Sequence, residues 1–379
     1  MKNLSLYIHY PFCVAKCRYC SFVSAAGAAE AERRRYADLL IRELELAALT
    51  PETAPRPLST VYFGGGTPSL MPPEDAARAL GAVRSLFGIA DGAEISIECN
   101  PGSIKSAKKH LGALREVGIN RVTVGAQSFD SKSLKFLGRI HTSSQTVKFF
   151  DAVREAGFVS AGLDLIYGLP GQSVSDWQSD LEMALSLNPD HVSLYCLEIT
   201  PGTPLGSALE AGEFEELPPE TQAEMYNAAR ETLASFGLIQ YEISNFAYPG
   251  HECRHNLAYW TGGDYIGAGI AACSHLGGWR WENERDPAAY EAKIAAGMLP
   301  HSYGELLSPG RRLRESAVMA LRTAAGFRPP APATRESVAL IRNLEHLAAQ
   351  GLLRKSVFGS FHLPAELCFV SDEIFAKIV

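Results

Sequence analysis

The chain has 379 residues, of which 46% are hydrophobic and 20% charged, and its formal net charge is −7. This composition excludes a disordered chain and provides enough apolar material for one large domain with a smaller appendage. Acidic and basic residues are interspersed along the chain and there is no concentrated basic stretch, so we expect no nucleic-acid partner.

The N-terminal segment and the clustered cysteines both indicate a reducing compartment, the cytoplasm. No apolar run approaches the roughly 20 residues of a membrane helix, and residues 1–13 lack the zones of a signal peptide. We therefore expect a cytoplasmic protein, with any membrane association arising only through a partner. In a reducing compartment, the cysteines that cluster at 13, 17 and 20 favour metal binding over disulfide formation.

Six short β-rich runs alternate with charged, Ala-rich stretches that are typical of helices. Nearly continuous apolar strands separated by helices predict an α/β fold with a parallel sheet that is buried on both faces. A curved, incomplete barrel of six strand-helix units and an open doubly wound sheet both fit this pattern. The predicted strands cover residues 4–10, 59–66, 94–100, 120–128, 160–168 and 191–199.

Polar or glycine residues follow the predicted strands where each one ends. In parallel α/β folds, ligands bind at the carboxyl edge of the sheet, so these residues predict one site at the strand ends. They are the cysteine cluster, residues 64–67, Glu98 with Asn100, Gln127 and Asp164.

After about residue 240 the strand-helix alternation stops. Residues 241–310 are rich in aromatics and glycine and are interpreted as a connecting region between a domain at 1–240 and a small module at 311–379. An amphipathic helix is expected over 308–327, followed by the linker RPPAPAT. The last 45 or so residues predict a small, mainly helical module with a hairpin around 352–363.

The cysteine motif CVAKCRYCSF, residues 13–22, has the spacing C-x₃-C-x₂-C. Thiolates are strong ligands for iron, and an iron–sulfur cube normally takes four of them, so three leave one iron open for another ligand. A structural zinc ion would need a closed set of four ligands. Only His9 is close enough in sequence to be an obvious fourth ligand.

This motif, within YIHYPFCVAKCRYCSF, resembles the signature of the radical S-adenosylmethionine (SAM) enzymes. The resemblance is to the branch that contains oxygen-independent coproporphyrinogen oxidase and the HemW-type heme chaperones. It extends through YFGGGTPSL, SIECNPG, GAQSFDSKSLKFLGR and GLDLIYGLPGQ, and so covers about the first two thirds of the chain. It implies a partial (βα)6 radical SAM barrel with a smaller C-terminal α+β or helical domain.

The resemblance also implies cofactors and the residues that bind them. Cys13, Cys17 and Cys20 would hold a [4Fe–4S] cluster, whose open iron would bind SAM. Glycines after the second strand would let the backbone approach the cofactor closely. The implied cofactor contacts are Tyr7, Tyr19, Gly65, Gly66, Thr67, Glu98, Gln127, Arg139 and Asp164. For Glu98, Asp164 and Arg139 an ordinary strand-end or surface role stays open, and we assign no catalytic residue.

Phe22 separates the two activities within this branch. The coproporphyrinogen oxidases carry a further cysteine at the matching position, whereas the HemW-type proteins carry phenylalanine, so Phe22 argues against decarboxylation. Alternatively, its ring packs beneath the cluster and excludes water, which would fit either activity.

HNLAYW, residues 255–260, resembles the heme-binding region proposed for HemW-type proteins, and imidazole is a common axial ligand of heme iron. His255 is therefore a candidate heme ligand, although a hydrogen-bonding loop histidine also fits. Family members commonly have histidine where this chain has Cys273, so a different axial chemistry stays open here. His251, Cys253 and His255 together form a weaker candidate metal site without an evident fourth ligand.

Two hypotheses follow. The favoured one is a heme-binding carrier that uses a [4Fe–4S] cluster and SAM, and hands heme to an acceptor that could be a respiratory enzyme. The alternative is a radical SAM enzyme that acts on a tetrapyrrole, such as a coproporphyrinogen III oxidase. The sequence leaves open the acceptor, the fate of SAM, covalent heme attachment and homodimer formation.

Overall fold

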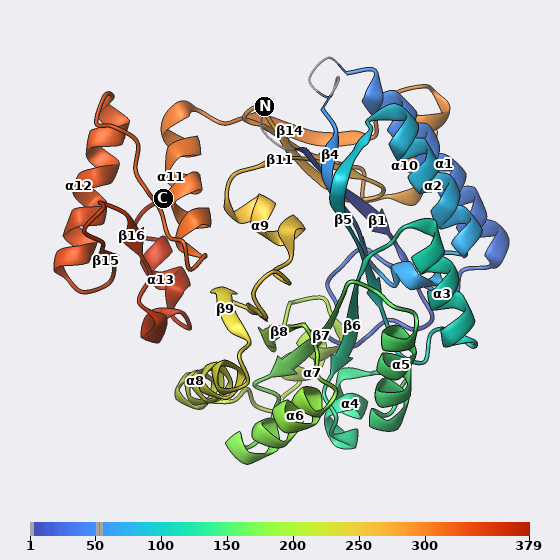
Figure 1. The fold of residues 1–379 in the computed structure, drawn as a ribbon, viewed down its shortest axis with the longest axis horizontal. Helices are drawn as coiled ribbons and strands as arrows, with labels where there is room; N and C mark the ends of the chain where they lie inside the picture. Colours follow the sequence, from blue (N-terminus) through green and yellow to red (C-terminus); the bar gives the residue numbers. More distant parts are fainter. Residues whose placement is uncertain (1–3, 51–52, 54–55) are drawn as a thin grey trace.

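The computed structural model describes residues 4–50, 53 and 56–379, so the first three residues of the N-terminal segment, for which no signal peptide is expected, lie outside it. One 12-stranded sheet dominates the described part of the chain. Helices cover its outer face, and the C-terminal module stands to one side (Figure 1). The order of strands in the sheet is β14-β13-β12-β11-β1-β4-β5-β6-β7-β8-β10-β9.

The centre of the sheet contains the six predicted strands, and each pairs in parallel with the next. Because neighbours in the sheet are also successive in the chain, there is no reversal of strand order of the kind that defines a doubly wound sheet. The prediction of a partial barrel is confirmed. The strands are β1 (Leu4–Tyr10), β4 (Leu58–Gly65), β5 (Ile89–Cys99), β6 (Arg121–Gln127), β7 (Ser160–Tyr167) and β8 (His191–Cys196).

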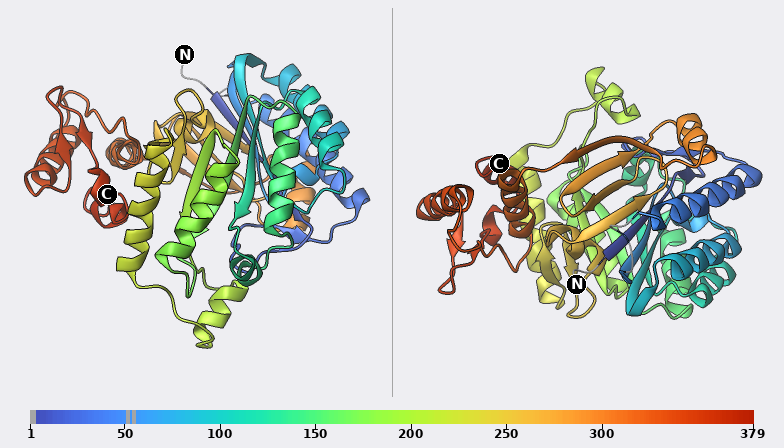
Figure 2. Two further views of the ribbon diagram at one scale, coloured as in Figure 1. Left: turned by 60° about the horizontal axis from the view of Figure 1, so that its bottom comes forward. Right: turned by 90° about the horizontal axis from the view of Figure 1, so that it is seen from above.

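Helices follow these strands and pack on the convex side of the sheet (Figure 2). Side-chain caps help to define where several of them begin: Thr142 and Ser173 each form a capping box with the third helical residue. The helices are α1 (Glu30–Ala48), α2 (Pro73–Leu86), α3 (Ala107–Val117), α4 (Ser131–Leu137), α5 (Ser143–Glu155), α6 (Val174–Ser186), α7 (Pro204–Glu210) and α8 (Pro219–Ser235), with a 3₁₀ turn η1 at Pro68–Leu70.

Alternate residues of each central strand serve the two faces of the sheet. Leu6, Ile8 and Phe63 belong to the main core beneath the helices. Their neighbours Tyr7 and Tyr62 point to the concave side, where their rings stack with centroids 6.2 Å apart. The concave side is therefore the polar, aromatic face on which a site can form.

Both edges of the barrel are extended by strands that the sequence analysis did not predict. On the β8 side lie β10 (Asn245–Ala247) and β9 (Ile239–Glu242). On the β1 side, β11 (Asp264–Ala268) is parallel, and β12 (Cys273–Leu276), β13 (Trp279–Asn283) and β14 (His301–Leu306) are antiparallel, with α10 (Pro287–Ala295) before β14. Much of the region interpreted as a connection thus belongs to the sheet.

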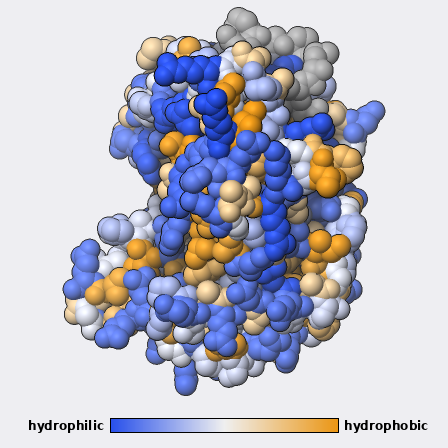
Figure 3. All heavy atoms as spheres, turned by 90° about the vertical axis from the view of Figure 1, so that its left-hand side faces the viewer, coloured by the Kyte–Doolittle hydropathy of each residue, from blue (hydrophilic) through white to orange (hydrophobic). Residues whose placement is uncertain are grey.

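The C-terminal module has its own core, which includes Leu321, Leu344 and Phe361. The predicted hairpin is confirmed as β15 (Arg354–Lys355) and β16 (Phe361–His362). The helices are α11 (Pro309–Leu321), α12 (Arg335–Ala349) and α13 (Ser371–Phe375), with a 3₁₀ turn η2 at Ala365–Leu367. On this side the surface is mainly hydrophilic, with hydrophobic residues in patches (Figure 3).

The helices in the described part of the chain do not meet the requirements of a membrane span. None combines the length and the apolar character that crossing a bilayer would need.

Candidate functional site

The three clustered cysteines lie on one loop that leaves β1 and returns to the barrel. The loop is closed at its base by β2 (Phe12–Cys13) and β3 (Ala25–Ala26), which pair in parallel. His9 fastens the returning end, because its Nε2 donates to the carbonyl of Val23 at 2.8 Å. None of the eight cysteines forms a disulfide. Three free thiols are therefore held at the carboxyl edge of the sheet.

The Gly-Gly-Thr turn after β4 supports the first cysteine. The amide of Gly66 donates to the carbonyl of Tyr10 at 2.9 Å, and the amide of Thr67 donates to that of Phe12 at 2.8 Å. The Thr67 hydroxyl lies 3.6 Å from the sulfur of Cys13. Gly65 has a φ of +111°, which glycine tolerates best. The turn and the cysteine loop thus form one unit.

Arg139 lies beneath the loop and not on the open surface. Its guanidinium donates to the sulfur of Cys17 at 3.2 Å, to Oδ1 of Asn100 and to the carbonyl of Gly125 at 2.7 Å. Tyr19, in the same loop, packs against a small cluster that includes Leu137. These contacts join the cysteine loop to β5, β6 and the end of α4.

Two half-buried carboxyl groups face the same space. Glu98 accepts hydrogen bonds from the Tyr62 hydroxyl at 2.9 Å and from the Gly65 amide at 3.2 Å. Desolvation, and then the charge of Asp164, raise the pKa of Glu98 to about 7. Desolvation raises the pKa of Asp164 to about 6, against the lowering effect of Ser193 and two arginines. Both carboxyl groups would be stabilised as anions by a cationic ligand.

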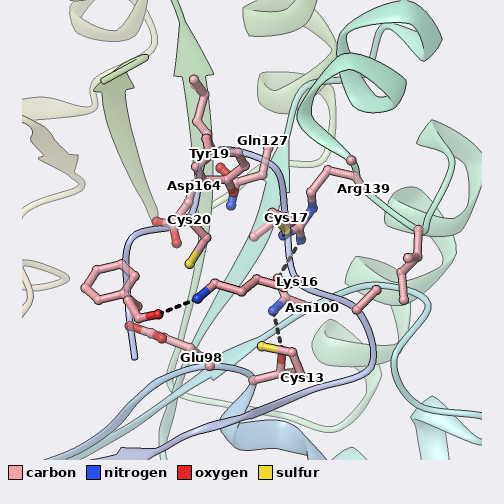
Figure 4. Close-up of a pocket in the computed structure, with 18 of the residues that line it drawn as sticks. Cys13, Lys16, Cys17, Tyr19, Cys20, Glu98, Asn100, Gln127, Arg139 and Asp164 are labelled. Carbon is pink, nitrogen blue, oxygen red and sulfur yellow. Dashed lines mark hydrogen bonds between the residues drawn. The ribbon is translucent and has the colours of Figure 1, made fainter. Parts of the chain in front are cut away.

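These side chains surround one cavity of about 400 Å³, which we call the cysteine cavity. Figure 4 shows the side chains converging from the loop and from several strand ends. Of the predicted site residues, the cavity is lined by Cys13, Cys17, Cys20, Tyr19, Gly65, Gly66, Thr67, Glu98, Gln127, Arg139 and Asp164. The strand-end prediction therefore brought together residues that lie far apart in the chain.

The expected cofactors can be tested against these residues. Oε1 of Gln127 and Oδ1 of Asp164 are buried without a hydrogen-bond partner within the described structure. Gln127 also has a φ of 67°, a backbone strain that is typical of functional sites. Unpaired acceptors, two carboxyl groups and three free thiols suit an iron–sulfur cluster with a cationic, amino-acid-containing ligand. The residues fit.

Tyr7 does not line the cysteine cavity. Its hydroxyl is hydrogen-bonded to Nδ1 of His9 at 3.1 Å, and on the concave side its ring centroid lies 6.2 Å from that of Tyr62 and 6.5 Å from that of His255. Its predicted role as a cofactor contact stays a prediction.

His255 lies in α9 (Arg254–Trp260), a short helix, and not in a loop. The side chain is 1% exposed, and both ring nitrogens have partners: Nδ1 and the Thr60 hydroxyl at 2.7 Å, Nε2 and the Tyr259 hydroxyl at 2.7 Å. Neither nitrogen is free to bind a heme iron in this arrangement. The geometry favours the hydrogen-bonding role.

The alternative metal sites have similar difficulties. Nε2 of His9 donates to a carbonyl and Nδ1 accepts from Tyr7, so His9 is not free to complete a zinc site. Cys253 is buried, with its sulfur 3.6 Å from Oε1 of Glu94. Among the described residues, no three His, Cys, Asp or Glu side chains are placed to hold a single metal ion.

Sequence reasoning named Asn100 at a strand end without giving it a role, and it missed Lys16. Asn100, which the strand-end pattern predicted, donates to Thr67 at 2.9 Å and accepts from Arg139. Lys16 lines the cavity and donates to the carbonyl of Phe22 at 3.1 Å. Phe22 itself is 63% exposed at the cavity mouth, so it does not pack beneath the loop.

Comparison with known proteins identifies the family of this chain. The family model of the radical SAM superfamily matches residues 7–184, which include the cysteines, Glu98, Gln127, Arg139 and Asp164. The chain is 37% identical to "Heme chaperone HemW" of Synechocystis sp. over 84% of this chain and 78% of that protein. It is 32% identical to the protein of the same name from Bacillus subtilis over 94% of this chain and 98% of that protein.

Among solved structures, coproporphyrinogen III oxidase (HemN) from Escherichia coli, a radical SAM enzyme, has a TM-score of 0.84. The match covers 100% of this chain and 90% of that one at 24% identity, and so it establishes the fold alone. The fold, the cysteine motif and the extent of the sequence matches together show that this chain belongs to the HemW family of the radical SAM superfamily.

Proposed function

We propose that this protein is a heme chaperone that binds heme, a [4Fe–4S] cluster and SAM, and transfers heme to an acceptor protein. The observation that carries the proposal is the match to heme chaperones over nearly the whole chain, with 94% of this chain and 98% of the B. subtilis protein aligned. The cysteine cavity supports its cofactor part, because the three thiols and the unpaired acceptors face one space.

In this proposal Cys13, Cys17 and Cys20 are the cluster ligands. Arg139 positions one of them, because its guanidinium donates to the sulfur of Cys17. Thr67 lies against the sulfur of Cys13. A reduced cluster of this kind can supply one electron to a bound sulfonium.

We assign the SAM contacts to the other residues of the cavity. Gly65 and Gly66 keep the turn close to the loop without a side chain between them. Glu98 and Asp164 provide carboxylates for the cationic groups of the ligand, and Gln127 provides an unpaired acceptor. Because the Glu98 and Asp164 carboxyl groups are largely removed from water, their attraction to a cation is stronger than it would be in bulk water.

A coproporphyrinogen oxidase is the second candidate, since HemN has the same fold. Phe22 favours the chaperone because this position, at the cavity mouth, carries a hydrocarbon ring and not a thiol. A benzyl side chain cannot exchange a proton or a hydrogen atom as a thiol can.

Three further parts of the proposal concern organisation. We assign residues 1–240 to a cofactor-binding domain, 241–310 to a region that extends its sheet and 311–379 to a separate module, which has its own core.

A loop with three free thiols needs a reducing environment, so we propose that the protein acts in the cytoplasm. The acceptor would be a heme protein, of which a respiratory enzyme is one example.

The test is anaerobic incubation of coproporphyrinogen III with the reconstituted, reduced protein and SAM, followed by mass spectrometry, with a known oxidase as positive control. We expect no divinyl product, and a heme titration of the same preparation is expected to give a saturable Soret band. Divinyl product at catalytic turnover would establish the oxidase. A failure to bind heme would refute the chaperone.

A further inference from the structure

Imidazole is a common axial ligand of heme iron when one of its ring nitrogens is free, and flat apolar walls suit the porphyrin. All ten histidines lie in the described part of the chain, and of these His301 alone lines either the cysteine cavity or the second cavity described below. His255 and His9 have both ring nitrogens hydrogen-bonded. The surroundings of His301 therefore decide whether it can bind a heme iron.

The second cavity lies between the C-terminal half of α1 and strands β11 to β14, and we call it the aromatic cavity. Figure 2 (right) shows these strands, in orange, beside α1 and α10 at one end of the sheet. The cavity has a volume of about 580 Å³, within the roughly 300–1,000 Å³ of ligand pockets. It is lined by Ala47, Ile266, Leu276, Trp279, Trp281 and His301, among others, and shares none of its lining residues with the cysteine cavity.

Two tryptophans form one wall. Trp279 and Trp281 are two positions apart on β13, so both side chains project from the same face of the sheet. Leu276 and Leu306 pair with Trp279 from the neighbouring strands and belong to that face. Trp279 is 52% exposed and Leu306 60% exposed, so this apolar wall continues to the molecular surface. Large indole faces next to solvent suit a flat, partly apolar ligand that must enter and leave.

His301 lies against this wall at the start of β14. Its ring centroid is 5.2 Å from that of Trp281, and no hydrogen bond to the imidazole occurs among the described residues. Desolvation, and then the charge of Lys293, lower the pKa of His301. The ring is therefore in its neutral form at neutral pH, which is the form that binds metals.

The ends of the cavity differ in polarity. Glu43 lies at the inner end, buried, where it accepts hydrogen bonds from the Gly269 amide, from Asn283 and from the Tyr290 hydroxyl. The hydrogen-bond donors to the Glu43 carboxyl are therefore all groups of the protein. Desolvation raises the pKa of Glu43 to about 7, and the described lining of the cavity contains no lysine or arginine. The anionic groups of a ligand would therefore find no cation inside and would face solvent, where Trp279 and Leu306 lie.

We propose that the aromatic cavity is a heme-binding site, with His301 as an axial ligand of the iron and Trp279 and Trp281 as walls for the porphyrin. The inference rests on the proposed heme-carrier function and assigns its cargo to a site separate from the cysteine cavity. The propionates point outward and the apolar edge of the macrocycle lies between α1 and β13. An acceptor can then reach the porphyrin at the exposed edge.

The test is a titration of the full-length, reconstituted protein with hemin, followed by the Soret band and by quenching of tryptophan emission. Removing groups that only orient a metal ligand costs about 10–100-fold in metal affinity, so His301→Ala is expected to weaken binding at least about tenfold. It should also shift the Soret maximum, because the coordination changes. Trp279→Ala should weaken binding and leave the Soret position unchanged.

The matched control is His275→Ala, because His275 lies on β12 and pairs with Arg280, which projects from the opposite face to Trp279 and Trp281. This variant should bind heme as the wild type does. Far-UV circular dichroism and iron content establish that each variant is folded. Wild-type heme binding that His301→Ala leaves unchanged would overturn the site but not the carrier function. A wild-type protein that binds no heme would refute the carrier function itself.

Discussion

Gly66→Ala provides a direct test of the unit formed by the turn and the cysteine loop. A Cβ on Gly66 would lie 2.8 Å from the carbonyl oxygen of Phe12, and 3.0 Å from both the Phe12 nitrogen and the Tyr10 oxygen. All three are backbone atoms and cannot rotate away, so the chain itself must move. The hydrogen bond from the Gly66 amide to the Tyr10 carbonyl, 2.9 Å long, would then be weakened.

The magnitude follows from these contacts. Overpacking of this kind costs about 1–3 kcal/mol, and the loss of one hydrogen bond adds about 0.5–1.5 kcal/mol. We therefore expect Gly66→Ala to lower the free energy of unfolding of the apoprotein by about 2–4 kcal/mol. Because Cys13 directly follows Phe12, the iron content after reconstitution should fall as well.

The assay is urea denaturation of the apoprotein, combined with iron and sulfide analysis after anaerobic reconstitution. Gly81→Ala is the control: Gly81 lies in α2, a Cβ there would have no atom within 4 Å, and alanine should stabilise the helix by up to about 1 kcal/mol. If Gly66→Ala were as stable as the wild type and retained a full cluster, the close approach of turn and loop would not hold.

Two further predictions concern the cysteine cavity. Cys17→Ala should abolish the iron and sulfide of the reconstituted protein, whereas Cys273→Ala, an exposed cysteine elsewhere, should retain both; equal iron in the two variants would remove Cys17 as a ligand. SAM affinity should fall as the pH drops, because Glu98 and Asp164, with pKa values of about 7 and about 6, become protonated and lose their attraction for a cation. If both must be ionised, SAM binding at about pH 6.5 should be about fivefold weaker than at about pH 8.5. In Glu98→Gln most of this pH dependence of SAM affinity should disappear. The measurement is calorimetry at constant iron content.

The six central strands and the cysteine motif could be predicted because their signals are local. Apolar runs such as residues 4–10 and 120–128 appear as strands without knowledge of their partners. The rule that ligands bind at the carboxyl ends of parallel strands then placed Glu98 and Asp164 in one site. The rule did not bring every predicted residue to the cavity lining: the Tyr7 hydroxyl is hydrogen-bonded to His9, and its role as a cofactor contact stays a prediction.

Segments with weaker local signals were missed. Strands β11 to β14 are short, and their sequence contains the glycine pair Gly277–Gly278 and charged residues such as Arg280. They form strands because β11 pairs with the free edge of β1, the first strand of the barrel, with Leu6 opposite Ile266. Edge pairing of this kind supplies hydrogen bonds that no local propensity encodes.

The sequence by itself determined the radical SAM motif, the six central strands and the residues at their ends, because spacing and periodicity act over a few residues. Only the tertiary structure decided that both ring nitrogens of His255 are hydrogen-bonded and that His301 lines a cavity. His255 is enclosed by Thr60 and Tyr259, and His301 lies open beside Trp281. The physical reason is that burial and hydrogen bonding of a side chain depend on partners far away in the chain, which only the folded structure brings next to it.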